Sequence, residues 1–292
     1  MCDAHVHFLS HRFFALLAAQ RNCPFEDLQP VLEWDMPLDP VTLASIWIKE
    51  LDRHNVARAS LIASLPTDET SVQAAVQAYP DRFHGYFMVN PAAPDSLAAV
   101  QRALAAGLQG ICLFPAMQRY SLHDPAVLAI LEEAAARPAT IVFIHCGVLT
   151  VGVRPKLGLP SPFDMRFSNP LDVHNLALRF PRLPFVIPHF GAGMFREALM
   201  LCDLCPNVYL DTSSTNSWMK YQEPGCSLAS VFQRALAVAG PHRLLFGTDS
   251  SFFPRGWHRA VFDQQVAVLH EVGVDAAQAE AILGGNLRRL LC

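Results

Sequence analysis

The chain has 292 residues, of which 52% are hydrophobic and 16% charged, and its formal net charge at neutral pH is −4. This composition is typical of a folded protein with a large buried core and excludes a mostly disordered chain. The acidic balance argues against a nucleic-acid partner, and no apolar run reaches the roughly 18–20 residues that a membrane span requires. No signal peptide precedes the first motif, so the cytoplasm is the expected location.

Eight short apolar segments recur along the chain, each bounded by turn residues. They cover 2–7, 57–64, 83–90, 110–115, 140–147, 184–191, 207–214 and 243–249. Each is almost continuously apolar, which is typical of strands whose sheet is covered on both faces.

Amphipathic helical patterns lie between these segments. They cover about 71–79, 95–106, 125–137, 171–180, 193–204, 227–239 and 259–272. Strict alternation of strands and helices predicts a parallel sheet, and eight repeats favour closure into one (β/α)8 TIM barrel over residues 1–292. Extra helices are expected after the first strand, at about 11–21, and at the C-terminus. An open doubly wound sheet is the alternative, but no G-x-G-x-x-G follows the first strand.

Three connections are longer than a barrel needs, at 8–40, 148–170 and 215–227. All three follow predicted strands. In a TIM barrel such loops lie at the C-terminal face, where active sites are built.

Eight cysteines are scattered through the chain, including the C-x-x-C pair Cys202 and Cys205. A chain of this size does not need disulfides, and a zinc ribbon would require a second C-x-x-C pair. We expect reduced thiols.

Five residues are candidates for a metal site. His5 and His7 are two positions apart on the first predicted strand, so their side chains point to the same side. His145, His189 and Asp249 end the fifth, sixth and eighth predicted strands, and a barrel brings these ends to one rim. A hydrolytic Zn²⁺ site uses about three or four nitrogen and oxygen ligands with one open position. The pattern therefore predicts a divalent-metal site.

Several motifs resemble those of the amidohydrolase superfamily, namely D-x-H-x-H at 3–7, I-H-C-G at 144–147, the histidine ending the sixth strand, G-T-D at 247–249 and I-L-G-G-N at 282–286. The resemblance is to the amidohydrolase-related branch, which contains metal-dependent hydrolases and aminocarboxymuconate-semialdehyde-type decarboxylases.

The resemblance assigns roles to the five candidates. It implies that His5, His7, His145 and Asp249 bind one divalent ion, with Zn²⁺ expected ahead of Mn²⁺, and that His189 acts on the substrate beside it. Some relatives bridge two metals with a lysine that ends the fourth strand. No lysine lies at that position here, so we expect a single ion.

Two reactions fit these residues. A bound ion lowers the pKa of a water and polarises a substrate oxygen. Asp249 would accept the proton and His189 would donate one, which gives hydrolysis of an amide, ester or lactone. The same residues would also serve a non-oxidative decarboxylase. An inactive binding scaffold is a third hypothesis, but it predicts missing ligands.

The loops suggest a small, carboxylated substrate. Arginine pairs well with carboxylates, and four arginines follow predicted strands: Arg119, Arg154, Arg166 and Arg255. Candidate residues for an apolar wall are Phe163, Trp218, Phe252, Phe253 and Trp257. A small molecule is thus the expected partner, and a homo-oligomer stays open.

Overall fold

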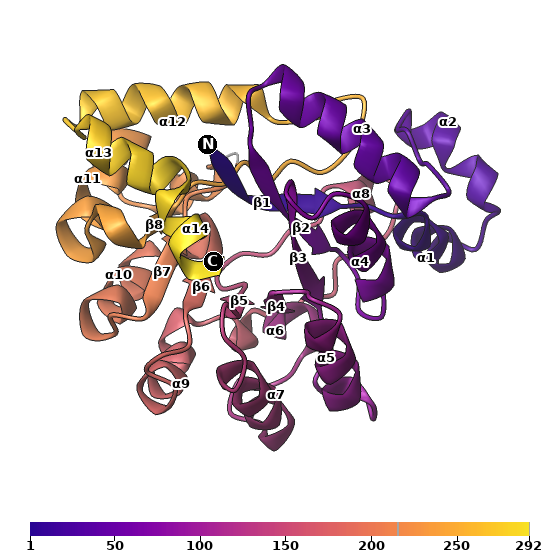
Figure 1. The fold of residues 1–292 in the computed structure, drawn as a ribbon, viewed down its shortest axis with the longest axis horizontal. Helices are drawn as coiled ribbons and strands as arrows, with labels where there is room; N and C mark the ends of the chain where they lie inside the picture. Colours follow the sequence, from indigo (N-terminus) through magenta and orange to yellow (C-terminus); the bar gives the residue numbers. More distant parts are fainter. Residues whose placement is uncertain (215, 292) are drawn as a thin grey trace.

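The computed structural model describes residues 1–214 and 216–291. Eight parallel strands pair in chain order, from β1 to β8 (Figure 1). Their bounds are Cys2–Phe8, Arg58–Ala63, Phe83–Met88, Gly110–Leu113, Ile141–Ile144, Phe185–Ile187, Val208–Asp211 and Leu244–Leu245. Each lies within or within one residue of a predicted apolar segment, and the predicted (β/α)8 architecture is confirmed.

The segment after β8 closes the barrel against β1. The Ala4 N–H donates to the Phe246 carbonyl over 2.8 Å, and the His7 N–H donates to the Ser250 carbonyl over 2.7 Å. In the opposite direction, the Asp249 N–H donates to the His5 carbonyl over 3.0 Å. Closure therefore places the end of the eighth strand beside the histidines of the first.

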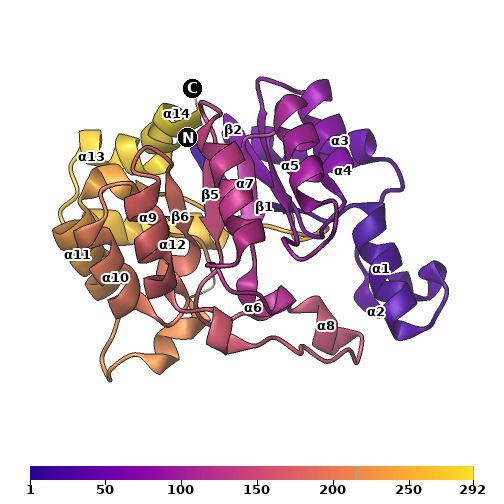
Figure 2. The same ribbon diagram turned by 90° about the horizontal axis from the view of Figure 1, so that it is seen from below.

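Helices alternate with the strands and surround them (Figures 1 and 2). They include α3 (Pro40–Arg53), α4 (Glu69–Ala78), α5 (Ser96–Ala105), α7 (Pro125–Ala135), α9 (His174–Arg179), α10 (Phe195–Leu204), α11 (Leu228–Ala239) and α12 (Arg259–Glu271). Caps fix several starts. Ser227 and Ser230 form a reciprocal capping box at α11. The helix predicted at 171–180 begins instead as a 3₁₀ turn, Pro170–Val173, before α9.

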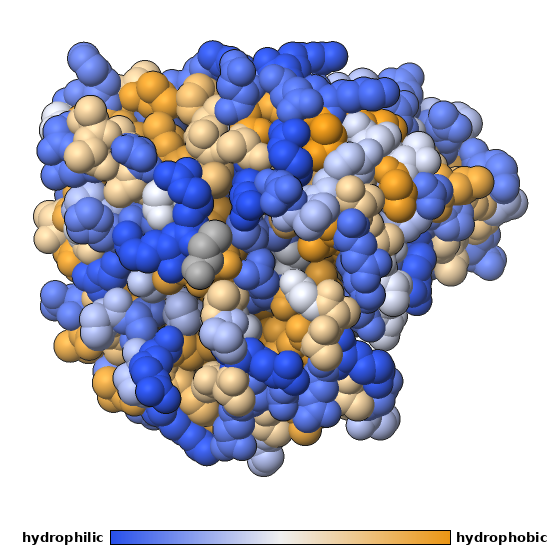
Figure 3. All heavy atoms as spheres, viewed as in Figure 1, coloured by the Kyte–Doolittle hydropathy of each residue, from blue (hydrophilic) through white to orange (hydrophobic). Residues whose placement is uncertain are grey.

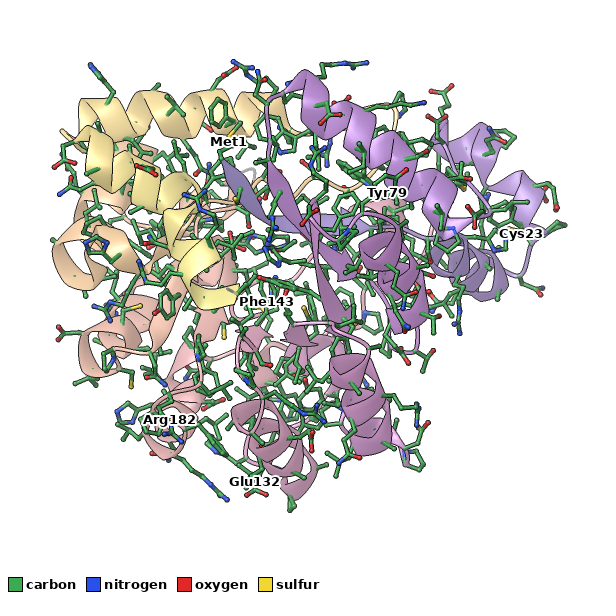
Figure 4. All side chains as sticks on the ribbon, viewed as in Figure 1. Met1, Cys23, Tyr79, Glu132, Phe143 and Arg182 are labelled. Atoms are coloured by element: carbon green, nitrogen blue, oxygen red, sulfur yellow. The ribbon has the colours of Figure 1, made fainter. Side chains whose placement is uncertain are left out.

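Two apolar layers hold the barrel together. On the outer face of the barrel, Trp47, Phe83 and Phe232 are buried between the sheet and the helices. Inside the ring lies a second cluster, which includes Phe143 (Figure 4). One end of this interior is closed by α14 (Asn286–Leu291), whose Leu287 is packed in the inner cluster, and α13 (Ala276–Glu280) precedes it in the chain.

A third cluster lies at the end opposite α14 (Figure 2). It joins α1 (His11–Arg21), α2 (Gln29–Leu32) and α8 (Val153–Lys156). The connections predicted at 8–40 and 148–170 therefore pack against each other as a roof on the strand-end face. Between them, α6 (Pro115–Gln118) follows β4. Thr215, the first residue of the third predicted connection, lies outside the described residues.

The outer surface mixes polar and apolar residues on the face that carries α14 (Figure 3). Among the described residues, no helix combines the length and apolarity needed to cross a membrane. The seven described cysteines are free thiols, and Cys292 lies outside the described residues.

Candidate metal centre and substrate cavity

Three side chains from the two joined strand ends face a common point. Nε2 of His5 and Nε2 of His7 lie 3.3 Å apart. Oδ1 of Asp249 lies 3.3 Å from Nε2 of His7 and 3.7 Å from Nε2 of His5. The three potential ligand atoms all lie within 4.8 Å of one another. Two imidazole nitrogens and one carboxylate oxygen so arranged fit a divalent ion such as Zn²⁺.

Local backbone geometry brings these residues together. His5 and His7 point into the barrel, while Val6 between them is packed in the outer layer. Asp249 has a left-handed backbone with φ 57°, which turns the chain after β8. Gly247 precedes it, and a Cβ there would lie 2.8 Å from Oδ1 of Asp211 and 2.9 Å from Cβ of His5. Only glycine leaves room for both neighbours.

Hydrogen bonds on the far ring nitrogens orient both histidines. Nδ1 of His5 donates to Oδ2 of the buried Asp211 over 2.6 Å, and Nδ1 of His7 lies 2.8 Å from Oγ of Ser64. Holding Nδ1 in this way leaves Nε2 with its lone pair free for a ligand bond. Burial opposes protonation of His5, but the charge and hydrogen bond of Asp211 prevail and raise the His5 pKa. Sequence reasoning missed Asp211, which lies inside the seventh predicted segment, 207–214, and ends β7 in the structure.

Asp3 ties β1 to the segment after β8. Its buried carboxylate accepts hydrogen bonds from the backbone N–H of His5 (2.9 Å), the hydroxyl of Thr248 (2.5 Å) and the indole N–H of Trp257 (2.8 Å). Burial raises the Asp3 pKa to about 6 even though these bonds lower it. The first residue of D-x-H-x-H therefore positions the centre and does not face it.

The other two histidines stand beside the triad. His189 has φ 56°, its ring centroid lies 5.0 Å from that of His5, and its Nδ1 lies 3.0 Å from both Oγ and the carbonyl of Ser213. His145 lines the same cavity, 5.3 Å from His189 between centroids, but it is outside the group whose ligand atoms meet. Its Nδ1 is buried and has no partner among the described residues. Its role as fourth ligand stays a prediction.

Burial sets the charge state of these two side chains. It lowers the pKa of His189, and it lowers the pKa of His145 well below the usual value, so both are neutral at pH 7. Burial tends to raise the pKa of Asp249, but the hydrogen bond from His7 and the charge of His5 outweigh burial and lower this pKa. The ionised carboxylate of Asp249 therefore stands beside two neutral imidazoles, those of His145 and His189.

A cavity of about 350 Å³ opens above the triad. Its lining joins the candidate ligands to the roof and includes Phe13, Trp34, Phe114, His145, Lys156, His189, Phe252 and Arg255. Of the five predicted substrate residues, Arg255 lines this cavity.

The other four are placed elsewhere by local partners. Arg119 donates to the carbonyl of Pro162 and Arg154 to that of Pro160. Arg166 forms an ion pair with Asp164 over 2.6 Å. Trp218 is buried against two phenylalanines, Phe190 and Phe195.

The residues of the predicted apolar wall do not all lie at the cavity. Phe252 lines the cavity, whereas Phe253 and Trp257 are buried in the outer core and Phe163 is not part of the lining. Sequence reasoning missed Trp34 and Lys156. Both belong to the long connections, which were correctly expected at this face.

A family model for amidohydrolases matches residues 2–291. The chain therefore belongs to the amidohydrolase family, and the resemblance seen in the sequence motifs is confirmed. One curated relative, protein fluG of Emericella nidulans, is 32% identical over 87 residues. That match covers 30% of this chain and 10% of fluG, so the chain aligns with only a small part of that relative.

Solved structures share the fold. A candidate 2-pyrone-4,6-dicarboxylic acid hydrolase from Pseudomonas putida aligns with TM-score 0.66 and 20% identity, over 99% of this chain and 96% of that one. 5-Carboxyvanillate decarboxylase LigW2 from Novosphingobium aromaticivorans, with bound manganese, gives 0.66 and 14% over 99% and 96%. A Burkholderia multivorans amidohydrolase with bound zinc gives 0.63 and 16% over 99% and 98%. At these identities the likeness extends to the fold alone.

Proposed function

We propose that this protein is a metal-dependent hydrolase that acts on an amide, ester or lactone of a small, carboxylated substrate. The observation that carries the proposal is the convergence of His5, His7 and Asp249 at the floor of a cavity large enough for a small molecule. Bound zinc and manganese in the neighbouring structures support a divalent ion here, with Zn²⁺ as our first choice.

His5, His7 and Asp249 would hold the ion, and His145 would complete the set from across the cavity. A divalent ion at this position supplies Lewis-acid chemistry, which makes a water more acidic and polarises a substrate oxygen. The assignment of His145 is supported by its buried Nδ1, which has no hydrogen-bond partner among the described residues.

The protein's own groups would move the protons. Asp249 is ionised and its side chain is 35% exposed toward the cavity, so it can accept a proton from the attacking water. Neutral His189 holds its one ring proton on Nδ1, against the Ser213 carbonyl, so its Nε2 would take up the proton that Asp249 receives from the attacking water and would donate it to the leaving group. Arg255 can bind the substrate carboxylate because its guanidinium donates to the Asp249 carbonyl and so lies beside the reacting groups.

Non-oxidative decarboxylation is the second candidate. It is favoured by the likeness to 5-carboxyvanillate decarboxylase and by the same placement of Arg255, which would hold a carboxylate close to the triad. An inactive scaffold is disfavoured because every predicted ligand is present. One experiment separates the three. Metal-loaded protein is incubated with carboxylated lactones, amides and hydroxybenzoates, and acid release and CO₂ release are followed in parallel.

Acid release that stops after chelation and returns with Zn²⁺ or Mn²⁺ supports the hydrolase. CO₂ release without acid release replaces it with the decarboxylase. No turnover of any compound by fully metal-loaded protein would favour the scaffold.

A further inference from the structure

Four apolar side chains form one wall of the cavity. Met88 ends β3, Phe114 follows β4, Met117 lies in α6 and Leu149 follows β5. All four line the cavity, and all four pack with the apolar cluster inside the barrel. Their side chains carry no charge, and their only polar atoms are two thioether sulfurs, which are weak acceptors. We call these four residues the methionine wall.

The methionine wall faces the candidate metal ligands. The strands pair in order from β1 to β8 and the segment after β8 closes the ring against β1, so β4 lies across the barrel from β8. Phe143 of β5 lies between the two sides, near the barrel axis (Figure 4). Its ring centroid is 5.1 Å from that of His5 and 6.3 Å from that of Phe114. A single aromatic side chain therefore separates the triad from the wall.

The wall combines a fixed part with an adaptable part. The ring of Phe114 is stacked on that of His145, with centroids 5.4 Å apart and planes 24° apart, and Phe114 itself is buried. The two methionines are unbranched and polarisable, so their side chains can follow the shape of an apolar group placed against them. The wall can thus accept hydrocarbon groups of more than one length.

The aromatic rings at the mouth of the cavity cannot take the same role. Trp34 and Phe252 stack on each other, with centroids 3.9 Å apart and planes 9° apart. Lys156 covers the outer side of Trp34, with Nζ 5.8 Å from the centroid, and Arg255 covers that of Phe252, with Cζ 4.4 Å away. Because both faces of each ring are occupied, the apolar surface open to a ligand lies at the methionine wall.

A charged group would be unfavourable against the methionine wall. A carboxylate placed there would lose its hydration without gaining a hydrogen bond, whereas a hydrocarbon group gains by leaving water. Arg255 follows β8 and donates to the Asp249 carbonyl, so it lies on the other side of the cavity. The two sides therefore favour opposite chemistry, an acid at Arg255 and a hydrocarbon at the wall.

We infer that the substrate is a monoacid whose uncharged hydrocarbon group binds against the methionine wall, and that Met117 contributes to this selection. Its acidic group binds Arg255, and the bond to be cleaved lies at the triad between the two. The inference rests on the proposed function for the identity of the reaction, but the selection is measured by binding alone.

The test measures binding of acetate, butyrate, hexanoate and adipate to the metal-loaded protein by calorimetry. None of these compounds contains an amide, ester or lactone bond. We expect the affinity to rise about fourfold with each methylene added between butyrate and hexanoate, since burying one contributes about 0.8 kcal/mol. Adipate has the length of hexanoate and a second carboxylate. It should bind about tenfold more weakly than hexanoate, because that carboxylate would be desolvated without a partner.

Three variants locate the effect. Met117→Gln keeps the length of the side chain and adds an amide, so the affinity for hexanoate should fall about fivefold while that for acetate changes less than about twofold. Met117→Leu keeps an apolar side chain and should retain the dependence on chain length. Met200→Gln makes the same substitution at an exposed position of α10 and should bind like the wild type.

Three results would overturn the inference: an affinity that does not rise from acetate to hexanoate, adipate bound as tightly as hexanoate, or equal weakening of acetate and hexanoate by Met117→Gln. The hydrolase proposal survives each of them if carboxylated lactones or amides are still hydrolysed. A protein that shows the dependence on chain length but hydrolyses none of these compounds retains the apolar subsite and loses the hydrolase.

Discussion

Nδ1 of His5 and Oδ2 of Asp211 are joined by a 2.6 Å hydrogen bond between two buried residues of β1 and β7. The bond fixes the tautomer of a candidate ligand, and removing such a partner typically costs about 10–100-fold in metal affinity. We expect Asp211→Asn to weaken metal binding by this factor while the fold is retained. Competition with a chelator measures the affinity. Asp263→Asn, at a surface ion pair on α12, is the matched control. Unchanged affinity in Asp211→Asn would show that His5 is oriented by other contacts.

One ion per chain is expected at this centre. The described residues offer one group of converging ligand atoms, and β4 ends without a lysine that could bridge two ions. Elemental analysis after gel filtration should give about one Zn²⁺ or Mn²⁺ per chain, and His5→Ala should give almost none. Two tightly held ions that both depend on His5 would contradict the single-ion centre.

His145 and His189 should behave differently on substitution. His145→Ala is expected to lower metal content, because this residue is assigned as a fourth ligand. His189→Asn should keep the metal but lose most turnover, because His189 is assigned to the substrate. Metal content and kcat are measured on the same preparations. If His189→Asn loses metal as fully as His145→Ala, the two roles are wrongly assigned.

Asp249→Asn tests the proposed base. Asparagine keeps the size and one acceptor oxygen but cannot be ionised. We expect at least partial metal occupancy, a retained fold and a loss of more than about 100-fold in kcat, in line with general-base contributions. Full occupancy with near-normal turnover would remove Asp249 from proton transfer and favour the decarboxylase.

His84 should make stability depend on pH in a predictable direction. Burial of this β3 side chain lowers its pKa, with Arg58 adding to the effect and a hydrogen bond to Gln109 opposing it. In the unfolded chain His84 takes up a proton below its ordinary pKa of about 6.5, whereas in the folded protein it stays neutral. The free energy of unfolding should therefore fall as the pH drops below that value.

Urea unfolding between pH 8 and 5.5 checks this effect. His84→Gln preserves the size and a hydrogen-bonding group but removes the titration. Its loss of stability over this range should be smaller than that of the wild type. Equal losses would mean that other groups account for the whole pH dependence.

The barrel could be predicted because its signals are local. Near-continuous apolar runs mark the strands, and the alternation of side chains along a strand puts His5 and His7 on one side. Asp249 could be added because barrel closure joins the first and last strand ends. Asp211 carried no such mark, since it lies inside the predicted segment 207–214 and its partner His5 is far away in the sequence.

The roof could not be predicted because its contacts are long-range. Trp34 and Phe252 lie in connections more than two hundred residues apart, and no periodic pattern relates them. Local hydrogen-bond and ion-pair partners also set the positions of the predicted substrate-binding arginines. Arg166 pairs with Asp164 two positions before it, so it is not available to the cavity.

Closure of the barrel interior by α14 restricts the route by which substrate enters and product leaves the cavity. With Leu287 and Phe143 packed inside the ring, the described residues fill the far end, so we expect the ligand to enter and leave by the mouth beneath the roof. An acidic product would leave past the cations that attract the next substrate. We therefore expect product inhibition that is competitive with substrate, and a turnover rate limited by product escape when product accumulates.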